Sequence, residues 1–333
     1  MRWGKKPVCP HCGGTQVTKR TRKFFFRCRN KACKKDFTVL FGTIFEASKL
    51  ELPKWFTLIG MMLNARKGMS AMQIQRNLGC TYKTAWYSAM RVRCAMIDEI
   101  SMLEGIVEMD EAYIGGKPRH RNSPDNKATL SRLETKRGRG TKKVAVVGIV
   151  EREGKKRVVT EVAGRLTTKN MLELLRKYVN TEKSIMMTDD ARFYARFENE
   201  IQHLIINHSK KKYVEGIIHT NTIEGFWSIV KNGIRGEFHV LSRKYLPFYL
   251  AEFSYKYNRR NTKETAFEET IENAVADDKC LVDYKPKCDV PEIENSKKAG
   301  KKICEKPKPK RVKRKPVKKK KTKPKKKKKA RKK

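Results

Sequence analysis

The hydrophobic periodicity of the chain changes near Ile106, and this change is the strongest constraint on its fold. Before this point apolar residues recur at helical spacing, whereas after it short apolar runs typical of buried strands alternate with helical segments. We predict strands at GIVEMD, KKVAVVGIVE, RVVTEVAG and KSIMMT, and helices at MLELLRKYV, NTIEGFWSIVKNG and LPFYLAEFSYKY. The alternation indicates a mixed α/β domain, with helices flanking a sheet. The long basic segment 117–143 between the first two strands is expected to be a loop.

Four of the nine cysteines lie in the first 33 residues, as a C-x2-C pair and a C-x4-C pair: Cys9, Cys12, Cys28 and Cys33. Two close thiolate pairs held apart by a short spacer suit a tetrahedral Zn²⁺ ion. The chain begins without a secretory segment, which favours metal over disulfides. His11 is an alternative ligand, and four free cysteines are the competing interpretation. We predict a structural zinc ribbon over residues 1–48.

The pattern of residues 49–101 predicts a helical module. Ser70 with Gln73 forms a capping box, Gly79 turns the chain, and Thr81 caps a basic helix. This pattern predicts a helix-turn-helix whose last helix enters a DNA major groove. A plain helical linker is the alternative. The candidate DNA contacts in the last helix are Lys83, Arg91 and Arg93.

The formal net charge is +44, and its distribution indicates a polyanionic partner. Residues 297–333 contain 24 Lys or Arg and one acid, a net of +23, which leaves +21 on residues 1–296. No apolar run is long enough to span a bilayer, so a membrane is not expected. Residues 276–333 are predicted to be a disordered tail. The tail resembles a nuclear-import signal for a eukaryotic host; otherwise the protein is expected in the cytoplasm on DNA. A solvated tail without function is the alternative.

Two of the predicted strands end in aspartates, Asp110 in MDEAYIGG and Asp189 in TDDARFY. Carboxylates at the carboxyl ends of neighbouring strands point into the cleft where α/β folds bind ligands. With Glu224 from a nearby helix they are candidate ligands for Mg²⁺ or Mn²⁺ in phosphodiester chemistry. Glu108 remains an alternative to Asp110, and Asp190 to Asp189. Glu224 also fits a structural role, as the third residue of a capping box begun by Asn221.

The motifs MDEAYIGG, TDDARFY and HTNTIEGFWSIVKNGIRG resemble the DDE transposases of the Merlin type and their bacterial insertion-sequence relatives. The resemblance covers roughly Val8 to Asn261. It implies an RNase H-like catalytic core, placed here at residues 102–275, preceded by the zinc ribbon and the helical module. It also implies a metal-binding triad of Asp110, Asp189 and Glu224, with Asn221 as an alternative third ligand, and a phosphate contact at Lys231.

The resemblance implies a transposase that binds double-stranded DNA at terminal inverted repeats, cleaves it with Mg²⁺ or Mn²⁺ and transfers strands. A homodimer or larger assembly on DNA is expected from that reaction. The competing hypotheses are a domesticated zinc-ribbon protein that binds DNA without catalysis, and a nuclease that cuts without joining. If the triad is correct, the carboxylates of Asp110, Asp189 and Glu224 should converge within metal-bridging distance.

Overall fold

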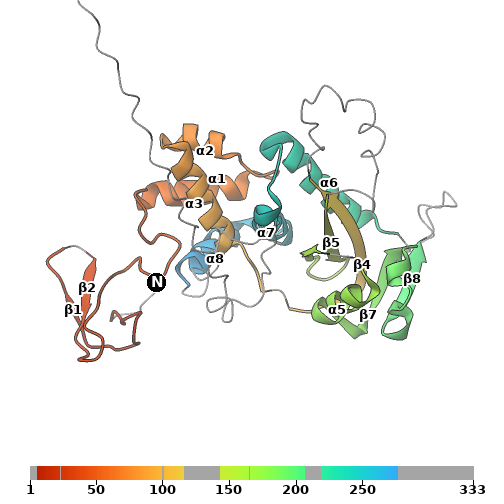
Figure 1. Ribbon diagram of the computed structural model, residues 1–333, viewed down its shortest axis with the longest axis horizontal. Helices are drawn as coiled ribbons and strands as arrows, with labels where there is room; N and C mark the ends of the chain where they lie inside the picture. The colour runs from red at the N-terminus through yellow and green to blue at the C-terminus, as the bar shows by residue number, and fades with distance from the viewer. Residues whose placement is uncertain are drawn as a thin grey trace, which may run out of the picture.

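The computed structural model describes residues 6–22, 24–99, 101–115, 143–164, 166–206 and 219–276. Figure 1 shows three parts along the chain: a small β ribbon, a group of helices, and a sheet covered by helices. The predicted loop at 117–143, except Lys143, and the predicted tail at 276–333, except Ala276, lie outside the described residues. None of the described helices is long and apolar enough to cross a membrane.

The ribbon is a three-stranded antiparallel sheet with the order β1-β2-β3, formed by Val17–Lys19, Phe25–Cys28 and Asp36–Thr38. Its buried side chains are few: Cys9, Cys28 and Phe37. Apolar burial on this scale is too small to stabilise an independent unit, so the ribbon needs another source of stability.

The helical group contains α1 (Leu52–Asn64), α2 (Ala71–Leu78) and α3 (Tyr82–Ala95). Ser70 accepts a hydrogen bond from the amide of Gln73, and Thr81 accepts one from the amide of Thr84, so both predicted N-caps are present. Gly79 ends α2 with φ of 61°, a conformation that favours glycine. A fourth helix, α8 (Lys263–Val275), packs against α1 and α3 in one core, although it comes at the end of the chain's α/β segment.

The α/β part has a mixed sheet, as predicted, with one strand more than the four expected. The strand order is β6-β5-β4-β7-β8. Strand β5 runs antiparallel to its neighbours β4 and β6, whereas β7 and β8 run parallel to β4. The strands are β4 Leu103–Ile114, β5 Val144–Glu151, β6 Val158–Ala163, β7 Val179–Asp189 and β8 Gln202–Ile206. The short edge strand β8 was not predicted from the sequence.

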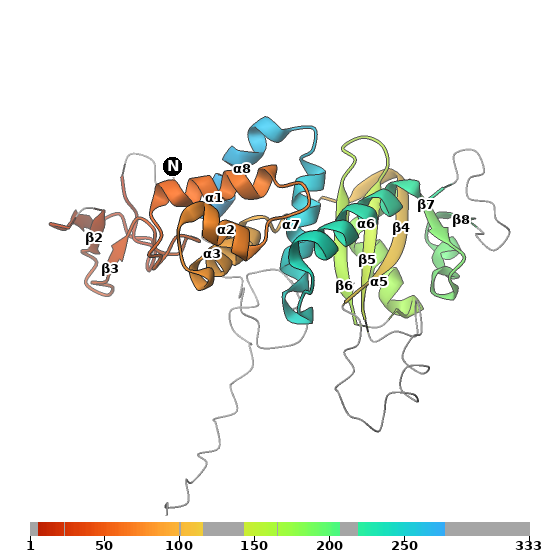
Figure 2. The ribbon, with the colours of Figure 1, turned by 90° about the horizontal axis from the view of Figure 1, so that it is seen from above.

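Helices cover both faces of this sheet (Figure 2). Alternate residues of β4 face opposite sides: Val107 and Met109 pack towards α5 (Thr168–Tyr178), and Ala112 and Ile114 pack towards α6 (Asn221–Gly233). A π-helical turn, Ile234–Phe238, extends α6. Short 3-10 turns lie at Arg192–Tyr194, Phe197–Asn199 and Arg243–Tyr245.

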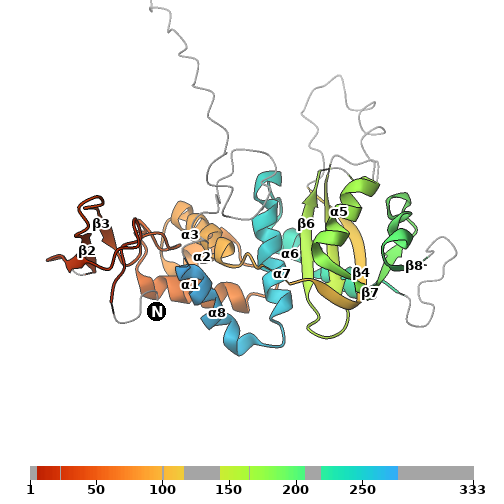
Figure 3. The same ribbon diagram turned by 90° about the horizontal axis from the view of Figure 1, so that it is seen from below.

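Helix α7 (Leu246–Asn258) joins the sheet to the helical group (Figure 3). At the sheet edge, the side-chain amide of Asn258 bonds both the N–H and the C=O of Val158 in β6, which satisfies backbone groups at that edge. On the other side, the buried Glu252 carboxylate pairs with Arg93 of α3 at 2.7 Å and with Lys256 at 2.8 Å. Burial alone would raise the pKa of Glu252, but the charges of Lys256 and Arg93 outweigh it and lower that pKa.

Helix α6 lies directly on the sheet because β5 has no side chain at Gly148. A Cβ added there would be 2.6 Å from Trp227 Cζ2 and 2.8 Å from Ile223 Cδ1, both on α6. Gly148 pairs with Asp110 across the β4–β5 ladder. The contact therefore sets the distance between α6 and the middle of the sheet.

Gly148→Ala is expected to destabilise the protein, because the new methyl group overlaps Trp227 and Ile223. The free energy of unfolding should fall by about 1–3 kcal/mol, the usual cost of overpacking. Gly225→Ala on the same helix is the control: a Cβ there meets nothing within 4 Å, and alanine should gain up to about 1 kcal/mol in a helix. Urea denaturation followed by tryptophan fluorescence measures both. Equal stabilities of the two variants would contradict the packing role of Gly148.

Candidate active site

The four predicted zinc ligands form one cluster. The Sγ atoms of Cys9, Cys12, Cys28 and Cys33 all lie within 4.8 Å of one another, with Cys9 to Cys33 at 3.8 Å and Cys12 to Cys28 at 3.6 Å. Four sulfurs in this arrangement fit a tetrahedral zinc ion, and the C-x4-C pair contributes both of its thiols. His11 is not part of the cluster; its ring lies 4.4 Å from that of Phe41.

The turn after the first cysteine pair favours the thiolate form of Cys12, the form that binds metal. Gly13 has φ of 70°, and a side chain at Gly14 would lie only 3.3 Å from Cys12 Sγ. The backbone hydrogen bond from Gly14 lowers the pKa of Cys12 to about 7. Burial raises the pKa of Cys28 to about 12, so the unmetallated cluster holds mostly neutral thiols there. A zinc ion would replace those protons.

The sheet places Asp110 and Asp189 at the same level on adjacent parallel strands. Glu108 of β4 is in register with Met187 of β7, so Asp110 and Asp189 lie two residues further along their strands. Asp189 is the last residue of β7, where the strand's carboxyl end meets the edge of the sheet. Both side chains are half-buried. The prediction that a strand ends in Asp189 is confirmed, whereas the one for Asp110 is wrong, because β4 continues to Ile114.

Glu224 is in the first turn of α6, but the capping box expected around it is wrong. The structure puts Thr220 at the N-cap position without a side-chain cap, and Asn221 is the first helical residue. The Thr220 hydroxyl instead donates to Glu224 Oε1 at 3.4 Å. The amide of Ile223 donates to Glu108 Oε2 at 2.8 Å, so a strand carboxylate satisfies this helix terminus.

Negative charge accumulates around Asp110. Burial, together with the nearby charges of Glu111, Asp189 and Glu224, raises the pKa of Asp110 to about 7, against a backbone hydrogen bond that lowers it. In the described part of the chain, the four cysteines are the group of ligand side chains tight enough to hold a metal as it stands. Asp110, Asp189 and Glu224 are close enough for the charges of Asp189 and Glu224 to raise the pKa of Asp110, but they do not form a comparably tight group among the described residues.

A groove of about 430 Å³ runs beside α6. Acidic side chains lie at one part of it and basic side chains further along the helix; its lining is Asp110, Glu224, Trp227, Ser228, Lys231, Asn232 and Arg235. Glu224, Ser228, Lys231 and Arg235 recur at spacings of four, seven and eleven residues, which places them on one helix face. Sequence reasoning found Lys231 and missed Ser228, Asn232 and Arg235, although the helical spacing could have identified Ser228 and Arg235.

The structure distinguishes the alternative ligands by their surroundings. Glu108 is fully buried and its oxygens accept hydrogen bonds from Arg152 and from Ile223. Asp190 is exposed beyond the end of β7, and it is Asp189 whose charge acts on Asp110. Asn221 is exposed and does not line the groove.

The predicted DNA contacts in α3 fall into different environments. Arg93 is 2% exposed and ion-paired with Glu252, which gives it a structural role in place of the predicted DNA contact. Arg91 donates to the carbonyl oxygens of Ile44 and Glu46 and holds the segment before α1. Lys83 is exposed in the first turn of α3, beside the half-exposed Tyr82.

Comparison with known proteins places these features in a family. A family model described as the ISXO2-like transposase domain matches residues 102–258, the segment that carries Asp110, Asp189 and Glu224. Residues 102–258 belong to the ISXO2-like transposase family. A second model, described as the transposase zinc-ribbon domain, matches residues 1–36. The predicted resemblance to insertion-sequence transposases is confirmed.

Similar proteins include one named "Uncharacterized protein in transposable element ISH50" from Halobacterium salinarum. It is 28% identical over 256 residues, covering 74% of this chain and 84% of that protein. Among solved structures, a pre-cleavage Mos1 transpososome gives a TM-score of 0.27 at 12% identity, covering 70% of this chain and 82% of that one. A Mos1 strand transfer complex gives 0.26 at 11% identity, covering 69% and 81%. The assignment of residues 102–258 to this family rests on the family model.

Cys12→Ser is expected to remove bound zinc and unfold the ribbon, because its buried apolar residues are too few to fold alone. The purified wild type should contain one zinc per chain, and the variant much less. Cys80→Ser, outside the cluster, is the control and should keep its zinc. Metal analysis and limited proteolysis of residues 1–48 measure the effect. A protease-resistant ribbon in zinc-free Cys12→Ser would contradict the metal role.

The raised pKa of Asp110 predicts a pH dependence of stability. Between the ordinary carboxyl pKa and about 7, the unfolded chain has released a proton that the folded protein retains, so the free energy of unfolding falls as pH rises and levels off above about 7. Asp110→Asn should abolish this fall. Thermal unfolding of both zinc-loaded proteins, free of other divalent ions, measures it between about pH 5.5 and 8. Parallel curves would contradict the assignment.

Proposed function

We propose that this transposase-family protein cleaves DNA at terminal inverted repeats and transfers the strands, with a divalent metal ion. The observation that carries the proposal is the groove beside α6, where Asp110 and Glu224 lie together with Lys231 and Arg235. Carboxylates near cations suit a site for a metal ion and a phosphodiester side by side. The family of residues 102–258 supports the same chemistry.

We place the metal at Asp110, Asp189 and Glu224. Their hard oxygen ligands suit Mg²⁺ or Mn²⁺. Burial and the repulsion between carboxylates raise the pKa of Asp110, and a bound cation would offset both. A cation bound there supplies positive charge and Lewis acidity for phosphodiester cleavage and transfer. Because the three carboxylates are not yet a tight group, metal binding requires their side chains to turn towards one another.

We assign the backbone of the reacting DNA strand to the outer part of the groove. Lys231 and Arg235 are exposed on the face of α6 that carries Glu224, so their charges follow the carboxylates along one line. Ser228 and Asn232 supply neutral hydrogen-bond donors between them. Phosphate contacts of this kind fix the position of a DNA strand without reading its sequence.

We assign recognition of the repeats to the N-terminal parts. The first turn of α3, with Tyr82 and Lys83, is its exposed end and is where a helix-turn-helix contacts base edges. The zinc ribbon carries further basic residues. Pairing two transposon ends requires a homodimer or larger assembly, and the lysine-rich tail would retain the protein on DNA, in the nucleus of a eukaryotic host or in the cytoplasm of a prokaryotic one.

The test is a strand-cleavage and strand-transfer assay with the repeats that flank the encoding gene, in Mg²⁺ or Mn²⁺. Glu224→Gln should lose at least about 100-fold in cleavage rate, since even partners of metal ligands cost 10–100-fold when changed. Glu268→Gln is the control, because Glu268 is exposed on α8 away from the groove. Lys231→Ala should weaken DNA binding and reduce its salt slope by about one.

The outcomes separate the competing hypotheses. Joined products that depend on Glu224 support a transposase, and cut products that never join indicate a nuclease. Tight binding to confirmed repeats without cleavage by the wild type would contradict the proposal and favour a domesticated DNA-binding protein. Equal cleavage by wild type and Glu224→Gln would remove Glu224 from the site.

A further inference from the structure

A buried carboxylate connects the central strand to the helix that carries Glu224. Glu108 is fully buried in β4, two residues before Asp110 and therefore on the same face of the sheet. Its Oε2 accepts the Ile223 amide of α6 at 2.8 Å, and its Oε1 accepts Arg152 Nε at 2.8 Å. The Glu108 side chain therefore links the strand that carries Asp110 to the first turn of α6.

Arg152 holds the other side of this connection. It lies in the turn after β5, and its Nη2 donates to the carbonyl oxygen of His219 at 2.6 Å and lies 3.1 Å from His219 Nδ1. The same guanidinium therefore binds the Glu108 carboxylate and the segment that leads into α6. Its side chain is 14% exposed, so these hydrogen bonds are largely shielded from water.

The other side-chain hydrogen bonds at the start of α6, among the described residues, are longer. Thr220 provides no side-chain cap, although its hydroxyl donates to Glu224 Oε1 at 3.4 Å, and the amide of Asn221 donates to His219 Nδ1 at 3.4 Å. Gly148 sets how closely α6 approaches the sheet, but apolar contacts with Ile223 and Trp227 are not directional. The hydrogen bonds that Glu108 accepts from Ile223 and that Arg152 donates to His219 are directional, and Ile223 is the residue next to Glu224.

We propose that Arg152 and Glu108 are positioning residues that hold Glu224 where it can share a metal ion with Asp110. The proposal rests on the metal site of the proposed function. It predicts that loosening this pair weakens metal binding without touching a ligand. Partners that orient metal ligands have this effect in other proteins, at about 10–100-fold in affinity.

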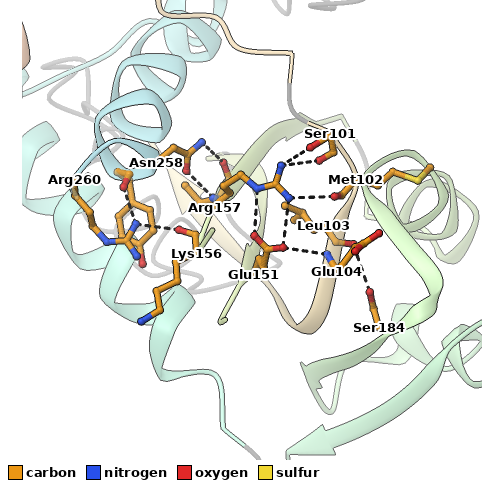
Figure 4. Close-up of polar contacts among 12 residues, drawn as sticks. Ser101, Met102, Leu103, Glu104, Glu151, Lys156, Arg157, Ser184, Asn258 and Arg260 are labelled. Carbon is orange, nitrogen blue, oxygen red and sulfur yellow. Dashed lines mark hydrogen bonds and ion pairs between the residues drawn. The ribbon is translucent and has the colours of Figure 1, made fainter. Parts of the chain in front are cut away.

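The chain offers a closely matched control in the same turn between β5 and β6. Arg157 pairs with Glu151 at 3.2 Å, with side chains 15% and 6% exposed, against 14% and 0% for Arg152 and Glu108. Figure 4 shows that Arg157 also bonds the backbone of Ser101 and Met102, in the segment before β4. This second pair has the same chemistry and similar burial, and it makes no contact with α6.

The experiment compares Mn²⁺ binding, measured by electron paramagnetic resonance, in zinc-loaded full-length protein. The variants are Arg152→Lys, Arg157→Lys and Asp110→Asn. Asp110→Asn identifies the binding that belongs to the site. We expect Arg152→Lys to weaken that binding by about 10–100-fold, and Arg157→Lys to leave it within about twofold, whereas both lower the melting temperature.

Hydrogen exchange gives a second readout that needs no metal. The Ile223 amide and its neighbours in residues 219–226 should exchange faster in Arg152→Lys and in Glu108→Gln than in Arg157→Lys or Glu151→Gln. If Arg152→Lys fails to fold, Glu108→Gln takes its place in the Mn²⁺ titration.

Two failures are distinguishable. If the wild type binds Mn²⁺ and both Arg152→Lys and Glu108→Gln bind it equally well, the positioning role is overturned and the metal site stands. If the wild type shows no Mn²⁺ binding that Asp110→Asn removes, the metal site is overturned, and the positioning role with it.

Discussion

The close approach of α6 to the sheet is the constraint on which the site depends. Gly148 removes the side chain that would separate Ile223 and Trp227 from β5, and it pairs with Asp110 on the neighbouring strand. Any residue with a Cβ would overlap the helix at that point. Because protein interiors are close-packed, a small displacement there moves the whole helix, and with it Glu224, Lys231 and Arg235. One absent side chain thus sets the width of the groove.

The buried carboxylates of this molecule lie in two kinds of electrostatic environment. Glu252 has two cationic partners that lower its pKa, and it joins α3 to α7 as part of the scaffold. Asp110 is largely buried and has carboxylate neighbours, and both raise its pKa, to about 7. A structural carboxylate is stabilised by the folded chain alone, whereas a cluster of like charges is stabilised by a cation from outside. The contrast separates the scaffold of the protein from its candidate metal site.

Local signals in the sequence were reliable where a feature depends on neighbouring residues. The caps at Ser70 and Thr81, the cysteine pairs, and the strand that ends in Asp189 involve residues close together in the chain. Features that depend on distant partners were missed or misread. The five-residue strand β8 has little pattern of its own, and Arg93 looked like a DNA contact until Glu252, 159 residues away, became its partner.

The sequence by itself determined the chemistry available to this protein: a four-cysteine cluster, an α/β alternation, three candidate carboxylates and a basic residue seven positions after Glu224. These follow from residue type and short-range spacing, which periodicity and ligand preference can read. Only the tertiary structure decided which of those groups meet. In the folded protein Glu108 accepts a hydrogen bond from the first turn of α6, Asp110 lies level with Asp189, and Arg235 lines the groove. Such choices depend on strand register and helix packing, which are properties of the assembled core.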